Sequence, residues 1–167
     1  MNILVTGGAG YIGSVTVEQL IEAGHKVVVY DSLYKGHAES VHPAATFVQA
    51  DLADKVAIAK ALGDNKVEAV MHFAADSLVG ESVQKPAKYF RNNVINTLNL
   101  LEAMQEAGVG RFVLSSTAAV YGEPESTPIK EDARLQPTNP YGESKLAIER
   151  FLPWYNGAYG LRWASLR

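Results

Sequence analysis

The chain of 167 residues contains no cysteine, which excludes disulfide bonds, thiol catalysis and cysteine-ligated metal sites and is compatible with a reducing compartment. It has no run of basic residues, and its formal net charge is −3, so nothing indicates a nucleic acid or an anionic membrane surface as a partner. The first apolar run begins at Ile3 and is interrupted by glycines, so it can form neither a signal peptide nor a membrane span. We therefore expect a cytoplasmic enzyme without a bound metal.

Strand-like and helix-like stretches alternate along the rest of the chain. Hydrophobic residues make up 47% and charged residues 20% of the sequence, which is ordinary for one domain with a substantial core. Short stretches rich in apolar and β-branched residues predict strands at residues 2–6, 26–30, 46–50, 67–74, 111–116 and 161–167, of which the third is the weakest. Helical spacing predicts helices at residues 12–23, 54–62, 86–107 and 140–155, and three prolines predict a loop at residues 121–139. This alternation predicts an α/β fold, a doubly wound parallel sheet of about six strands with helices on both faces.

Four glycines fall within seven residues directly after the first predicted strand: Gly7, Gly8, Gly10 and Gly13. They match G-x-G-x-x-G, and also G-x-x-G-x-x-G, between a strand and a helix, which is the context that a dinucleotide-binding motif requires. Glycine permits the tight turn, lets the backbone approach a pyrophosphate and lets the helix pack close to the strand. The alternative is a glycine-rich turn without a ligand. The strand, the helix and the acid that follows favour a Rossmann-like dinucleotide site.

The acid expected at the end of the second strand is Asp31. A carboxylate there can accept hydrogen bonds from ribose hydroxyls and repels a 2′-phosphate, which favours NAD over NADP. Lys35 lies nearby in the sequence and weakens this preference slightly.

Tyr141 and Lys145 form a Y-x-x-x-K pair on the helix that Pro140 opens. Residues at i and i+4 lie on one helical face, so the ammonium can stabilise the phenolate and make Tyr141 a base toward a hydroxyl group. A chance surface pair is the alternative. The stretch SSTAAVYG, which leaves the end of the fifth strand, favours a site because its Thr117 hydroxyl can bind a reacting oxygen. We expect Ser116 to be only a polar strand end that leads into an exposed loop.

Seven stretches together resemble the extended short-chain dehydrogenase/reductase family, and within it the branch of the UDP-glucose 4-epimerases. They are TGGAGYIGS, VVVYDSL, QADLAD, HFAADSLVGES, KPAKYFRNNVINTLNLLEAM, VLSSTAAVYGEP and NPYGESKLAIER, and they span nearly the whole chain in the family's order. One departure is Ser77, where some members carry lysine.

The resemblance implies a role for each matching position. Thr117 would contact the sugar, Tyr141 would be the base, and Lys145 would bind the nicotinamide ribose and tune Tyr141. Thr117 and Tyr141 would be the substrate contacts, on a UDP-sugar. The resemblance also implies that the loop from Asp31 to Gly36 holds the adenosine ribose and that the stretch from Phe73 to Ser77 lines the cofactor. Together, the glycine motif and the resemblance assign the following residues to the NAD site: Gly7, Gly10, Tyr11, Ile12, Gly13, Asp31, Ser32, Leu33, Lys35, Gly36, Asp51, Leu52, Phe73, Ala74, Ala75, Ser77, Asn92, Tyr141 and Lys145.

The reaction that the resemblance implies is inversion at C4 of a nucleotide-linked sugar through a transient 4-keto sugar. A nucleotide-sugar dehydratase ranks lower, because Ala118 and Ala119 stand where relatives of that kind carry acidic residues. The family adds a C-terminal sugar-nucleotide domain, which we expect to be absent from residues 1–167. A second alternative is therefore an NAD-binding fragment that does not turn over alone. Family members are commonly homodimers through two long helices, here those opened by Pro86 and Pro140.

Overall fold

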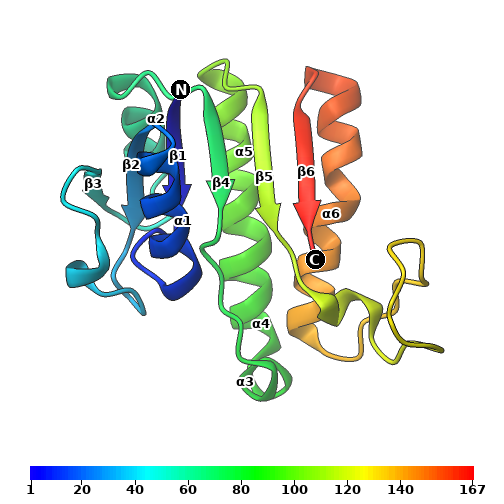
Figure 1. Ribbon diagram of the computed structural model, residues 1–167. Helices are drawn as coiled ribbons and strands as arrows, with labels where there is room; N and C mark the ends of the chain where they lie inside the picture. Colours follow the sequence, from blue (N-terminus) through cyan, green and yellow to red (C-terminus); the bar gives the residue numbers. More distant parts are fainter.

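The predicted apolar runs form one sheet of six parallel strands in the computed structural model, which describes all of residues 1–167 (Figure 1). The strand order is β3-β2-β1-β4-β5-β6, and the expected doubly wound, Rossmann-like α/β fold is confirmed. The strands are β1 (Asn2–Thr6), β2 (Lys26–Asp31), β3 (Thr46–Gln49), β4 (Ala69–His72), β5 (Arg111–Ser115) and β6 (Arg162–Leu166).

The order of the strands reverses at β1, which pairs with β2 on one side and with β4 on the other. Thr6, the last residue of β1, is in register with both Tyr30 and His72. Chains leaving neighbouring strands at such a reversal diverge to opposite sides of the sheet and leave a crevice at the carboxyl ends of the strands. The residues after β1, β2 and β4 are therefore placed around one crevice.

Helices cover both faces of the sheet. Helix α1 (Tyr11–Glu22) packs Val17 against Val5 and Val29 on one face. On the other face, α2 (Lys55–Asp64), α5 (Asn96–Glu106) and α6 (Pro140–Tyr159) bury a larger apolar core with β1, β2, β4 and β5. None of the helices has the length and hydropathy needed to span a bilayer.

The sequence predicted the helix at residues 86–107 with nearly the right extent but missed its internal structure. It consists of α4 (Pro86–Tyr89), the π-helical segment η2 (Phe90–Ile95) and α5. The short α3 (Val79–Gln84) was not expected, nor were the 3-10 turns η1 (Ala38–Ser40) and η3 (Ala118–Tyr121). π-helical turns occur mostly as single insertions in longer helices, frequently at functional sites.

Helix α6 begins where predicted and continues past the expected end at residue 155. Asn139 is its N-cap, with the side-chain oxygen accepting a hydrogen bond from the Gly142 N–H at 2.9 Å, and Pro140 occupies the first turn. The helix passes through Pro153 and ends at Gly160, whose left-handed φ of 70° supplies the stop. The N-terminal turn of α6, which carries Tyr141, is thus fixed by its cap, and Lys145 lies one turn farther along.

Candidate cofactor and active site

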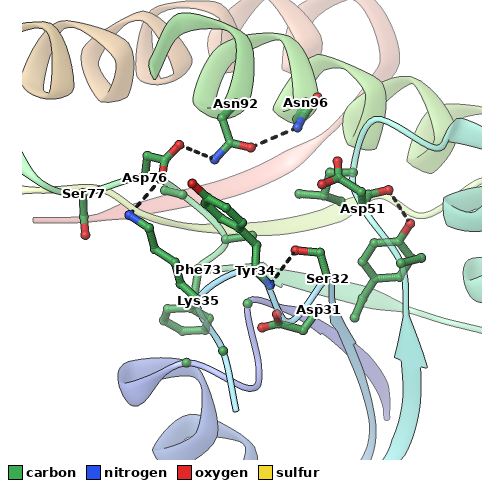
Figure 2. A pocket seen from close by; sticks show the side chains of 18 of the residues that line it. Asp31, Ser32, Tyr34, Lys35, Asp51, Phe73, Asp76, Ser77, Asn92 and Asn96 are labelled. Carbon is green, nitrogen blue, oxygen red and sulfur yellow. Dashed lines mark hydrogen bonds and ion pairs between the residues drawn. The ribbon is translucent and has the colours of Figure 1, made fainter. Parts of the chain in front are cut away.

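A cleft of about 290 Å³ opens at the carboxyl ends of β1, β2 and β4 (Figure 2). Residues from the glycine turn, from the loop after β2, from the end of β3 and from the loop after β4 form its walls, and η2 lies above it. Most of the residues assigned to the NAD site from the sequence lie together in its lining: Gly7, Gly10, Tyr11, Asp31, Ser32, Lys35, Gly36, Asp51, Leu52, Phe73, Ala74, Ala75, Ser77 and Asn92.

Five further residues line the cleft: Tyr34 and Asp76, which lie inside the ranges 31–36 and 73–77 that the resemblance assigns to the cofactor, and Tyr30, Ala50 and Asn96, which were missed. Tyr30 and Ala50 are direct neighbours of assigned positions, so their places in the chain could have indicated them. Asn96 reaches the cleft only through the way its helix lies over it (Figure 2).

Five assigned residues do not line this cleft: Ile12, Gly13 and Leu33, which lie around the glycine turn and the loop after β2, and Tyr141 and Lys145, which are described below. Ile12 is exposed on α1, and Gly13 is buried beneath the glycine turn. Leu33 has a left-handed φ of 59°, and its N–H donates to Asp31 Oδ1 at 2.9 Å. It therefore shapes the loop after β2.

The glycines of the turn differ in whether the packing around them leaves room for a side chain. A Cβ on Gly13 would lie 2.1 Å from the Gly7 carbonyl oxygen, and one on Gly7 would lie 2.6 Å from the Ala74 nitrogen, so packing demands glycine at both positions. A Cβ on Gly10 would meet only the Gly7 oxygen, at 3.3 Å, and its φ of −85° suits any residue. Gly10 is also the N-cap of α1 without a side-chain cap, so the free N–H groups of the first turn can bind a phosphate at the cleft.

The Asp31 carboxylate joins the glycine turn to the loop after β2. Its Oδ2 accepts a hydrogen bond from the Ala9 N–H at 3.1 Å, and its Oδ1 accepts one from the Leu33 N–H at 2.9 Å. A carboxylate offers about four acceptor positions, so lone pairs remain for ribose hydroxyls at the cleft. Farther along the cleft, the Tyr30 hydroxyl donates to the Asp51 carbonyl at 2.9 Å and fixes the segment after β3 (Figure 2).

Tyr141 and Lys145 lie outside this cleft, at the carboxyl end of β5. The Lys145 ammonium donates to the Ser115 carbonyl at 2.8 Å, and because the side chain is only 2% exposed, burial lowers the pKa of Lys145 to about 8. The half-buried Tyr141 meets the ring of Tyr89 edge-on, with centroids 6.5 Å apart. Thr117, two residues beyond Ser115, accepts a hydrogen bond from the Ala119 N–H at 3.1 Å.

Ser116 lies at the polar end of β5, directly after its last residue, where it also connects the strand to α6. It is half-buried, and its hydroxyl donates to the Glu149 carboxylate on α6. Arg167 also donates to Glu149, through Nε at 3.1 Å, and to the Tyr121 hydroxyl through a terminal nitrogen at 3.0 Å. The loop that carries Thr117 is therefore tied to α6 at Ser116 and to Arg167, the residue after β6, at Tyr121.

His72 is a fully enclosed side chain at the end of β4. Its Nδ1 lies 2.6 Å from the Thr6 hydroxyl and its Nε2 lies 2.8 Å from the Thr97 hydroxyl. Burial, and to a smaller extent the positive charge of Lys145, lowers the pKa of His72 to about 3. The ring is therefore neutral at pH 7 and serves to pack β1 and β4 against α5.

The chain matches the model of the NAD dependent epimerase/dehydratase family over residues 3–167. All 167 residues align at 50% identity with 51% of the UDP-glucose 4-epimerase of Lactobacillus helveticus, and the whole chain aligns at 54% identity with 51% of that of Streptococcus mutans. A crystal structure of the Brucella ovis UDP-glucose 4-epimerase with NAD superposes with a TM-score of 0.97 at 44% identity, over 99% of this chain and 51% of that one. The chain thus spans about half the length of the relatives it matches. It belongs to the NAD dependent epimerase/dehydratase family.

Proposed function

We propose that this chain supplies the NAD site and the catalytic base of a UDP-glucose 4-epimerase. The observation that carries the proposal is the cleft at the reversal of the sheet, where Gly10, the free N-terminus of α1 and Asp31 meet. The family match and relatives of about 50% identity support the substrate class. In the relatives, about half of the length lies outside the matched region. We infer that residues 1–167 form the cofactor domain and that contacts to the sugar nucleotide also come from that other half.

The chemistry of the proposal divides between two walls: the cleft after β1, β2 and β4, which would hold NAD, and the end of β5 with α6, which carries Tyr141 and Lys145. When bound, NAD would take a hydride from C4 of the sugar and return it to the opposite face. Tyr141 would accept the proton of the 4-hydroxyl group, and Thr117 would hydrogen-bond the same oxygen. Lys145, held by the Ser115 carbonyl, would keep a positive charge beside the phenolate and reach the nicotinamide ribose.

Two measurements on the purified chain test this function. Calorimetric titration with NAD should show binding, and conversion of UDP-galactose into UDP-glucose should be followed in the same sample. Binding without turnover favours the second candidate, an NAD-binding unit that needs further residues for catalysis, which the half-length match to the relatives supports. Absence of NAD binding by the folded chain contradicts both candidates.

The assembly and location of the protein belong to the same proposal. The resemblance implies a homodimer through the helices opened by Pro86 and Pro140, and these carry exposed apolar side chains at Phe90, Ile95, Trp154 and Tyr159. Sedimentation velocity should give a dimer that Ile95→Glu and Trp154→Glu weaken. A cytoplasmic location fits, because NAD and UDP-sugars are soluble metabolites.

A further inference from the structure

The loop after β2 places a cation beside the proposed ribose site. A Cβ on Gly36 would lie 2.9 Å from Asp31 Oδ1, so this loop folds back over the Asp31 carboxylate, and Lys35 directly precedes Gly36. In dinucleotide sites, a cationic side chain near the acid after the second strand is what accommodates a 2′-phosphate. Lys35 thus stands where it could favour NADP, against the effect of Asp31.

The Lys35 ammonium is already paired. It extends across the cleft to Asp76, with Nζ 3.1 Å from Asp76 Oδ1 (Figure 2). Lys35 is 44% exposed, whereas Asp76 is only 2% exposed, so the carboxylate is the fixed partner.

Asp76 is held in place from several directions. Asn92 Nδ2 donates to Asp76 Oδ2 at 3.1 Å, and the Asn93 side chain bonds both the N–H and the carbonyl of Asp76, at 2.8 and 2.9 Å. A second ammonium, that of Lys88, lies 3.5 Å from Oδ1, but Lys88 is closer to the Glu81 carboxylate, at 2.9 Å. Lys35 is therefore the nearest cation to Asp76.

If Lys35 moved to a 2′-phosphate, the buried Asp76 carboxylate would keep only Lys88 as a nearby cation, and Lys88 also pairs with Glu81. Removing one partner of a buried ion pair is costly, because the remaining charge stays desolvated. Building on the proposed NAD site, we propose that Asp76 is a specificity-determining residue: it neutralises Lys35 and so prevents the cleft from accepting NADP.

The test is a double-mutant cycle on the purified chain, with NAD and NADP titrated calorimetrically. Asp76→Asn keeps the size of the side chain and releases Lys35. It should tighten NADP binding about five- to tenfold, the range expected for one partly screened charge contact, while NAD affinity changes less. Adding Lys35→Met should abolish the gain. Asp64→Asn removes a charge whose partner is Lys60 on α2, far from the cleft, and should leave both affinities unchanged.

The NADP affinity of Lys35→Met alone is a second test, which does not depend on the folding of the Asp76 variant. Because Lys35 is already paired, its loss should leave NADP affinity within about twofold of the starting value; a clear loss would show that Lys35 is free to bind the phosphate. Unchanged NADP binding by a folded, NAD-binding Asp76→Asn variant also overturns the inference. An unmodified chain that binds neither dinucleotide overturns the proposed function, and the inference with it.

Discussion

The proposed site has two walls that are built in different ways: the cleft that would bind NAD, and the end of β5 with α6, which carries Tyr141 and Lys145. The wall formed after β1, β2 and β4 presents backbone, glycine and carboxylates with free lone pairs to an open cleft. The wall formed by β5 and α6 is closed: Ser144, Lys145 and Glu149 are buried, and each is occupied by hydrogen bonds within the protein. The first wall is suited to binding a ligand that fills it, and the second to holding a few reactive groups still. Mutations on the first wall should therefore change affinity, and mutations on the second should change rate or the pH dependence of stability.

The largest expected effect is on rate, at Tyr141. In a form of the protein that turns over UDP-galactose, Tyr141→Phe should lower kcat by about 10²–10⁴-fold, because the proton acceptor is lost, while NAD affinity stays within about twofold. Tyr89→Phe is the matched control, since its hydroxyl donates to the Leu78 carbonyl at 2.7 Å and has no role in the proposed mechanism. Tyr141→Phe with a nearly normal kcat would remove Tyr141 from the mechanism.

The next effect is on folding, at Gly13. Gly13→Ala places a Cβ at 2.1 Å from the Gly7 oxygen, so the turn or α1 must move, and we expect a loss of several kcal/mol in the free energy of unfolding. Urea titration followed by circular dichroism measures it. Gly63→Ala is the matched control: nothing lies within 4 Å of a Cβ there, and replacing a glycine of α2 should stabilise by about 0.5–1 kcal/mol. Equal stabilities for the two variants would contradict the packing role of Gly13.

The difference between the walls also explains what the sequence could predict. The glycine turn, Asp31 and the alternation of strands and helices are local patterns, and the structure places nearly all of them as expected. The π-helical turn at Phe90–Ile95 was missed, since its polar side chains bond partners distant in sequence, as Asn93 does with Asp76 and Ser144. The apolar spacing alone predicts an ordinary α-helix for this segment.

Lys145 shows the same limit at a single residue. Its spacing from Tyr141 correctly places it on α6, one turn farther along. Its burial and its bond to the Ser115 carbonyl depend on how α6 packs against the end of β5, which no local pattern contains. The ion pair between Asp76 and Lys35 could not be predicted from the sequence for the same reason, because the two residues lie on different loops.

The lowered pKa of Lys145 predicts a pH dependence of stability. Burial lowers this pKa from 10.5 to about 8, so below pH 8 both states carry the proton and the folded state bears the full cost of a buried ammonium. As the pH rises from 8 to 10.5, the folded state releases its proton first, and stability should increase by roughly 2–3 kcal/mol relative to Lys145→Met. Urea denaturation of both proteins across this range isolates the difference. Parallel pH profiles would mean that the ammonium is not desolvated.

The smallest expected effect tests the open wall at Gly10. Gly10→Ala adds a methyl group that meets only the Gly7 oxygen, at 3.3 Å, so the free energy of unfolding should change by less than about 1 kcal/mol. The same methyl group faces the cleft at the N-terminus of α1, where the pyrophosphate would lie against the backbone. We expect NAD affinity to fall about tenfold, which corresponds to about 1.4 kcal/mol. Calorimetric titration beside urea denaturation separates affinity from stability in one sample. If Gly10→Ala keeps full NAD affinity, the phosphates do not approach the cap of α1; if it unfolds as readily as Gly13→Ala, both glycines serve packing, and the open wall is as constrained as the closed one.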